Sequence, residues 1–270
     1  MKLRIKFIVA FLVVAVLSAC GVINKANKGK GFNFFSLSQD KQLGFQTASE
    51  IDGNPGQFPL LDSVKYAKVY QYLYKVRDNI LNAGEVSLKD EFDWRLRIVH
   101  DDETLNAFCT PGGYIYFYTG ILKFLESEDE LAGVMAHEIA HADMRHSTRQ
   151  MSTMYSIQII EQLALGDPTL LSQFTKSIVN LKFSRKHETQ ADEMSVKYLC
   201  PTVYNAAGGA GFFQKLEAMS EGGRQPEFLS THPNPANRIE NFINNKTING
   251  CAGTNDFKVE YQKMIAMLPN

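Results

Sequence analysis

The sequence of 270 residues predicts an α+β fold, mostly helical with a small β-sheet. The prediction rests on where strand-like alternation and helical spacing of the hydrophobic residues occur along the chain. The segment Trp94–Val99 alternates between apolar and polar side chains, which is typical of a strand. Leu105–Cys109 and Tyr114–Tyr118 flank the turn Pro111-Gly112-Gly113 and therefore predict a hairpin. Helical spacing dominates on both sides of these strands, so the strands form one small sheet between two helical flanks.

The composition is that of an ordinary folded protein, because 44% of the residues are hydrophobic and 21% are charged. The formal net charge of -1 removes any electrostatic case for nucleic-acid binding. A chain of this length can bury a large core, and a single domain is predicted over residues 39–270.

The N-terminal segment has a different character. Basic residues precede the apolar run Phe7–Leu17, whose eleven residues reach roughly 16 Å as a helix, about half a bilayer core. Residues 1–19 therefore read as a secretory signal. The end of this signal resembles a bacterial lipobox, after which Cys20 is lipidated; an ordinary signal followed by a chance cysteine is the alternative. Residues 20–38 are polar and glycine-rich, which predicts a flexible tether.

This interpretation predicts a location as well. The protein would be held by its lipid at the periplasmic face of a bacterial membrane, and Gly21 after the lipidated cysteine is compatible with sorting to the outer membrane. Contact with the membrane is expected only through this N-terminal anchor.

Two helices are predicted before the strands, at Ser38–Ile51 and Asp62–Asn82. After the strands, Ser127 followed three residues later by Glu130 is a capping-box pattern. The apolar spacing that follows predicts an amphipathic helix.

The motif His137-Glu138-Ile139-Ala140-His141 lies on this predicted helix. His137 and His141 are one turn apart on the same side, so their imidazoles can converge on one metal ion. Glu138 is placed to reach a water on that ion rather than to bind it. A chance pair of histidines on a solvated helix is the competing interpretation, and such a match is roughly a one-in-a-hundred event in a chain of this length.

A second helix, ending before Pro201, carries Glu188 and Asp192 on one face. Taken alone, such a pair is normally solvated surface charge. A catalytic zinc site needs three protein ligands, however, and the histidine pair lacks the third. Glu188 would complete a His2Glu set, and Asp192 would accept the free N–H of a ligand histidine, which fixes its tautomer.

Several segments together resemble a known family. They are His137–His141 continued by Arg145-His146-Ser147, then Phe183-Ser184-Arg185 with Glu188, Ala191 and Asp192, then Thr231-His232-Pro233 with Arg238 and Ile239. Over roughly Ser38 to Ile243 the sequence resembles the HtpX/CAAX-protease-like family of gluzincin metallopeptidases, and most closely its soluble periplasmic branch. The resemblance implies a zincin-like fold, one Zn2+ per chain, and an envelope endopeptidase that hydrolyses misfolded or unassembled proteins in protein quality control.

The expected chemistry assigns roles to two further groups. Zinc polarises the scissile carbonyl and makes its water acidic, and Glu138 acts as the catalytic general base. The developing oxyanion needs another donor, for which His232 is the best catalytic candidate. On the residues alone, His232 is a loop histidine ordered by the neighbouring prolines. The resemblance implies that it lies near the metal, either as a transition-state donor or as a reversible plug on the open position.

The remaining histidines rank lower. His100 is predicted to be structural and His146 to be a packing or capping group, whereas His187 is predicted to be exposed, about 100° around the helix from the ligand carboxylate. Arg185 and Arg238 are candidate ion-pair partners of the carboxylates.

Peptide substrates need a binding edge. The arm Tyr114–Tyr118 is predicted to be an edge strand to which an extended substrate backbone adds, the alternative being an ordinary tyrosine-rich strand. Besides Cys20, the cysteines are Cys109, Cys200 and Cys251, which allow at most one internal disulfide; Cys200–Cys251 is possible, without local support.

Two other functions compete with this hypothesis. The first is an envelope chaperone or assembly factor with a gated or idle protease site, whose C-terminal helices bind envelope-protein partners. The second is a metallohydrolase that acts on non-peptide substrates, which an HExxH motif alone permits.

Overall fold

The computed structural model describes residues 32–223 and 226–269. The predicted signal, Cys20 and most of the predicted tether lie outside these residues. In the described part the protein is mostly helical with one small sheet, which confirms the predicted fold class. Among these residues, no helix combines the length and the apolar character that crossing a membrane requires.

The helices are α2 (Leu37–Asp52), α3 (Ala67–Asn82), α4 (Thr119–Phe124), α5 (Glu128–Asp143), α6 (His146–Met154), α7 (Ile157–Ala164), α8 (Pro168–Val179), α9 (Arg185–Leu199), α10 (Gly208–Glu221), α11 (Glu227–Thr231), α12 (Arg238–Ile248) and α13 (Lys258–Ile265). The strands are β1 (Leu96–Val99), β2 (Ala107–Thr110) and β3 (Tyr114–Tyr118), with a short 3-10 turn at Pro111–Gly113.

The predicted hairpin is confirmed, because β2 and β3 pair antiparallel across the Pro111–Gly113 turn. The prediction that Tyr114–Tyr118 is an edge strand is wrong. The strand order is β1-β3-β2, so β3 pairs with β1 on its other side, in parallel. Backbone groups of β3 are thus used on both sides, and β1 and β2 are the two edge strands. The outer side of β1 bonds to residues 59–61.

Local capping explains where two of the helices begin. Ser36 accepts from the Gln39 N–H and the Gln39 side chain accepts from the Ser36 N–H, a complete capping box that starts α2 close to the expected position. The second helix begins at Ala67, later than expected, because Asp62 first accepts from the N–H groups of Val64 and Lys65 and holds residues 63–66 as a turn.

Helix α5 is the central element of the fold, and it contradicts the expected amphipathic pattern. All of its residues are buried, because α3, α9, α10 and β2 pack around it. It does start after Ser127, but without the expected capping box. The Ser127 hydroxyl donates to Asp129, and the Glu130 carboxylate accepts from the Glu126 N–H at 2.8 Å.

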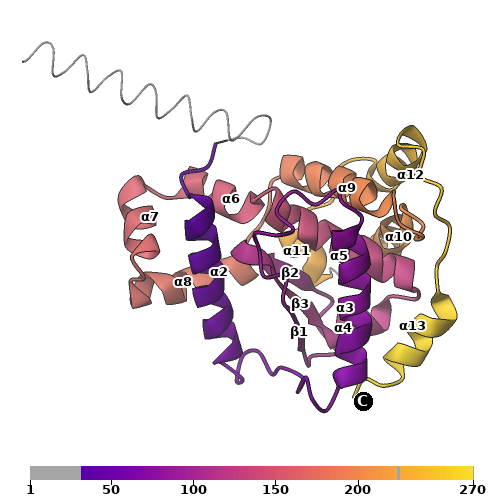
Figure 1. The fold of residues 1–270 in the computed structure, drawn as a ribbon, viewed down its shortest axis with the longest axis horizontal. Coiled ribbons are helices and arrows are strands. Elements are labelled where there is room, and N and C mark those ends of the chain that lie inside the picture. Colours follow the sequence, from indigo (N-terminus) through magenta and orange to yellow (C-terminus); the bar gives the residue numbers. More distant parts are fainter. Residues whose placement is uncertain (1–31, 224–225, 270) are drawn as a thin grey trace, which may run out of the picture.

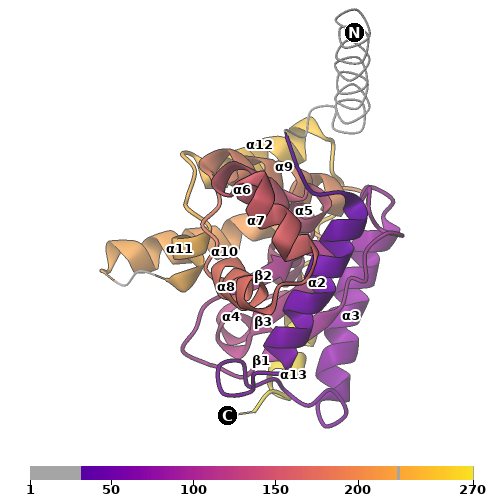
Figure 2. The ribbon, with the colours of Figure 1, turned by 90° about the vertical axis from the view of Figure 1, so that its left-hand side faces the viewer.

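Close helix packing around α5 depends on glycine. A Cβ on Gly133 would lie 2.5 Å from the Gly209 backbone nitrogen, so α5 and α10 approach this closely only because position 133 lacks a side chain. Figures 1 and 2 show α6, α7 and α8 gathered beside α2, and α7 and α8 pack against it. A second apolar cluster lies there, separate from the main core around α5.

Candidate metal centre

Helix α5 brings two imidazoles together in the protein interior. His137 and His141 are one turn apart, as the motif spacing predicts, and their Nε2 atoms are 3.0 Å from each other. Both side chains are fully buried. Two ring nitrogens this close, out of contact with water, need a proton or a cation between them.

Helix α9 adds a carboxylate to this pair. Ser184 caps α9 by accepting from the His187 N–H, which places Glu188 in the first turn, facing α5. One oxygen of Glu188 lies 3.4 Å from His137 Nε2 and the other 3.4 Å from His141 Nε2. Burial raises the pKa of Glu188, but the charge of His232 and contacts with both α5 histidines hold that pKa well below its usual range.

The fourth member is His232, which directly follows α11. Its Nδ1 lies 3.3 Å from His137 Nε2 and 3.2 Å from Glu188 Oε1. Its ring stacks on Phe228, with the centroids 4.3 Å apart, and it is buried. The loop histidine expected on residues alone is therefore part of the cluster.

The donor set fits a zinc-sized cation. One donor atom from each of His137, His141, Glu188 and His232 lies within 4.8 Å of every other. Bonds of about 2.0–2.1 Å in a tetrahedron separate the ligand atoms by about 3.3 Å. The shortest separations found here are 3.0 to 3.4 Å. Imidazole nitrogens with one carboxylate oxygen are also the ligands that zinc accepts.

A further set of charges holds the cluster in place. Asp192 Oδ1 lies 2.9 Å from His137 Nδ1, so His137 keeps its proton on the side away from the cluster. Burial lowers the pKa of His137, but its contacts with Asp192 and Glu188 outweigh burial and raise that pKa to about 9. Arg238 Nη2 lies 2.7 Å from Asp192 and 3.2 Å from Glu188. Of the two arginines considered from the sequence, Arg185 is exposed and Arg238 is the partner.

Glu138 lies beside the cluster without joining it. Burial raises the pKa of its carboxyl group, which the charges of His232 and His137 partly oppose. Its Oε1 is 3.6 Å from His232 Nε2 and has no hydrogen-bond partner among the described residues. A carboxylate with a raised pKa and a free oxygen is suited to accept a proton from a substrate water.

One contact of the site was missed in the sequence. His146 Nδ1 lies 3.0 Å from His141 Nδ1, so His146 orients a cluster histidine rather than only packing. The sequence gives little sign of this contact, because His146 lies beyond the end of α5. Its ring reaches His141 because the chain reverses at Arg145, a non-glycine residue with a left-handed φ of 57°. Arg145 is held in that conformation by its ion pair with Asp40.

The prediction that His187 is exposed is wrong, because it is half-buried and stacks on His146. His100 is exposed at the end of β1.

The α5 motif, the α9 carboxylate and the adjacent Glu138 define a helical metallopeptidase of the HExxH class. The model of peptidase family M48 matches residues 70–245, and the chain belongs to this family. The resemblance found in the sequence is thereby confirmed.

Relatives include bacterial and mitochondrial proteins. The chain is 26% identical to metalloprotease LoiP of Escherichia coli over 264 residues, which cover 93% of this chain and 99% of LoiP. It is 31% identical over 214 residues to mitochondrial metalloendopeptidase OMA1 of Schizosaccharomyces pombe, covering 77% of this chain and 61% of the relative. A putative beta-barrel assembly-enhancing protease of Vibrio cholerae is 31% identical over 153 residues, which are 51% of this chain and 32% of the relative. The chain thus spans about three fifths of the length of the yeast OMA1 proteins it matches.

Proposed function

We propose that the protein is a zinc-dependent endopeptidase of the bacterial cell envelope, with His137, His141 and Glu188 as its metal ligands. The observation that carries the proposal is the set of 3.0 to 3.4 Å separations among these donor atoms, with Glu138 directly beside them. Membership of peptidase family M48 supports peptide bonds as the substrate class.

The residues divide the chemistry between them. When bound, a zinc ion supplies the Lewis acidity that polarises a carbonyl and makes a water molecule acidic. Glu138 takes the proton of the attacking water and returns it to the leaving amine, for which its raised pKa suits it. Asp192 and Arg238 keep His137 and Glu188 oriented.

His232 acts in this proposal as a plug. Its Nδ1 points into the donor set, within 3.3 Å of both His137 and Glu188, where a substrate carbonyl or water would have to enter. Release of His232 would open the site and leave Nε2 free to donate to the oxyanion. Replacing His232 by alanine separates the two roles, because cleavage rises if the histidine mainly blocks and falls if it mainly donates.

The substrate backbone is proposed to join β2 rather than β3. The Tyr118 N–H donates to the Asn106 carbonyl, so every second residue from Asn106 onward, Phe108 and Thr110, bonds to β3. Ala107 and Cys109, which lie between them, direct their backbone groups away from β3. The Cys109 N–H lies close enough to the Glu138 carboxyl group to lower its pKa. An extended peptide on this edge would therefore run beside the metal ligands.

The proposed location follows from the N-terminal sequence. Cys20 would carry the lipid, residues 20–38 would form the tether, and the domain of residues 39–270 would work at the periplasmic face of the outer membrane. Its substrates would be misfolded or unassembled envelope proteins, in line with the name of the Vibrio cholerae relative. Conversion of Cys20 to serine should release the protein from the membrane fraction; retention of the serine variant there would contradict lipid anchoring.

Glu138→Gln tests the catalytic proposal. The variant keeps the size of the side chain, so bound zinc should remain at one per chain while cleavage of unfolded casein falls by about 10² to 10⁴-fold. A chelator should abolish wild-type cleavage, and added zinc should restore it. Equal cleavage by both proteins would refute the role of Glu138. Absence of casein cleavage together with suppression of aggregation by both proteins would favour the chaperone alternative.

A further inference from the structure

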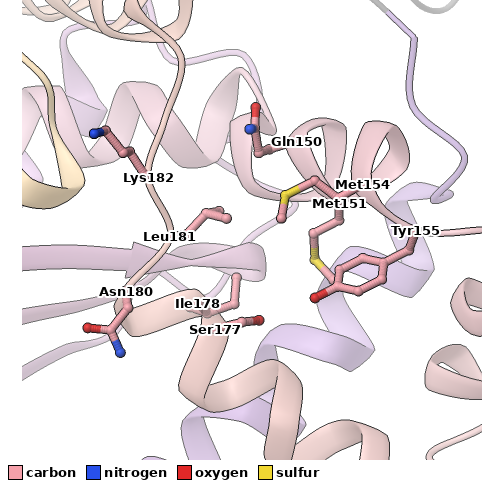
Figure 3. A pocket seen from close by; sticks show the side chains of 9 residues that line it. All are labelled: Gln150, Met151, Met154, Tyr155, Ser177, Ile178, Asn180, Leu181 and Lys182. Carbon is pink, nitrogen blue, oxygen red and sulfur yellow. The ribbon is translucent and has the colours of Figure 1, made fainter.

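A cavity lies between α6, the end of α8 and the extended segment after it (Figure 3), two residues along the chain from Phe183, which contacts His141. Its volume is about 290 Å3. The buried part is apolar, with Met151 from α6, Ile178 from α8 and Leu181 from the segment. None of the roles proposed above uses this cavity.

Both walls of the cavity lead to His141 within a few residues. On one side, Leu181 is two residues before Phe183, whose ring stacks on His141 with the centroids 4.0 Å apart. On the other side, Met151 is five residues after His146, whose Nδ1 is 3.0 Å from His141 Nδ1. At about 3.3 Å per extended residue and about 1.5 Å per helical residue, the backbone from the cavity wall to Phe183 or to His146 covers roughly 7 Å. The contact of these residues with His141 adds 4.0 Å or 3.0 Å.

The whole path of roughly 10 Å is within reach of a bound peptide. A substrate whose scissile carbonyl lies at the cluster extends about 3.3 Å per residue in either direction along its chain. A side chain two positions from the cleaved bond, which adds its own length to roughly 7 Å of backbone, therefore reaches the mouth of the cavity. The segment with Leu181 and Phe183 also borders the plug, because the Phe183 N–H donates to the Thr231 carbonyl, directly before His232.

The lining indicates which side chain would enter. Methionine is unbranched and adapts its shape to irregular partners, and the cavity has two methionines, the buried Met151 and the largely exposed Met154. Polar groups such as Gln150 and Lys182 also line it and come from its two opposite walls. A large aliphatic or aromatic side chain would be buried there beneath a polar rim, an arrangement found in side-chain pockets.

We propose that this cavity is the specificity pocket of the peptidase, and that it takes one large apolar side chain of the substrate within two residues of the cleaved bond. The inference rests on the proposed endopeptidase function and adds the sequence preference that backbone pairing alone would not provide. Unfolded proteins expose such side chains and folded ones bury them, so the pocket would also select unfolded substrates.

Ser177 provides a test that leaves the metal ligands untouched. It is half-buried on α8 and lines the cavity, so Ser177→Phe would fill the space from within. Ser172 is a matched control: it is half-buried on the same helix, but it lines a different cavity of about 160 Å3. Gln150→Phe fills the first cavity from the opposite wall and keeps the test available if Ser177→Phe folds poorly.

The primary measurement is sequencing of the cleavage sites in unfolded casein. In the wild-type protein and in Ser172→Phe, kcat/KM should favour Leu, Met or Phe over Ala at one fixed position by about 10- to 100-fold. In Ser177→Phe this preference should fall at least about tenfold, with zinc content unchanged. A wild-type protein that cleaves without positional preference, or a preference that survives in both filled variants, would overturn the inference and leave the endopeptidase function standing.

A binding measurement on the inactive Glu138→Gln protein needs no turnover. A labelled hexapeptide with Leu at the preferred position should bind about tenfold or more tightly than its Ala counterpart, and adding Ser177→Phe should remove that difference. Equal binding of the two peptides would overturn the pocket. Complete absence of cleavage by the wild-type protein would instead refute the proposed function itself.

Discussion

Removal of the Asp192 carboxylate should weaken zinc binding without removing a ligand. Asp192 Oδ1 contacts His137 Nδ1 at 2.9 Å and Arg238 Nη2 at 2.7 Å, and the side chain is 4% exposed. In Asp192→Ala, His137 loses the group that holds its tautomer and its ring orientation. Loss of such an outer contact typically costs 10- to 100-fold in metal affinity. That corresponds to about 1.4 to 2.8 kcal/mol, at about 1.4 kcal/mol per factor of ten.

The assay is a competition for zinc between the protein and a chromophoric chelator at fixed pH. Asp192→Asn should lie between the wild type and the alanine variant, because its amide oxygen can still accept from His137 but carries no charge. Glu193→Ala is the control, since it removes an exposed carboxylate from the neighbouring position of α9. If Asp192→Ala binds zinc as tightly as Glu193→Ala while both retain their helical circular dichroism, the assigned role of Asp192 is wrong.

Three further predictions concern stability and activity. The first is removal of zinc by a chelator, which should lower the free energy of unfolding by about 4 kcal/mol if free zinc was a thousandfold above its Kd. Calorimetry would record a Tm lower by roughly 8 to 16 °C. An unchanged Tm would contradict a core stabilised by the metal. The second concerns the Cys200–Cys251 disulfide, which joins residues 51 positions apart. Replacing both cysteines by serine should lower the free energy of unfolding in urea by about 4 kcal/mol. An unfolding midpoint equal to that of the oxidised wild type would contradict a stabilising role for the disulfide. His232→Ala should raise the initial rate of casein cleavage, whereas a fall would assign the histidine to catalysis.

Helix periodicity was sufficient to predict the part of the site that lies on one helix. A spacing of four residues places His137 and His141 on the same side of any α-helix, whatever surrounds it. Glu188 could not be found in this way, because an acidic residue in the first turn of a helix is common on surfaces. It was identified only because a two-histidine site lacks a ligand and the family resemblance supplied one. Its complete burial in the structure shows that the solvated-charge interpretation does not apply.

Features that depend on non-local pairing were out of reach. The turn before Tyr114–Tyr118 predicts a strand but does not determine both of its neighbours, and the parallel partner β1 places this strand in the middle of the sheet. The same holds for the cysteines. Their odd number left the pairing open, and folding joins Cys200 to Cys251 while Cys109 stays free and buried among the described residues.

Burial of α5 is the largest departure from expectation, and the charges around it explain how it is tolerated. Three acidic side chains, Glu138, Glu188 and Asp192, lie in the interior with one arginine, Arg238, and none is more than 3% exposed. Metal binding requires neutral histidines. With these four groups ionised, two negative charges then remain where water is excluded, which is strongly unfavourable without a counter-ion. A divalent cation held by the histidines and Glu188 would cancel both charges. Without the ion, the raised pKa of His137, about 9, lets a proton on its ring offset part of this charge. The charge that favours a divalent cation therefore comes from four residues on α5, α9 and α12, which no single motif contains.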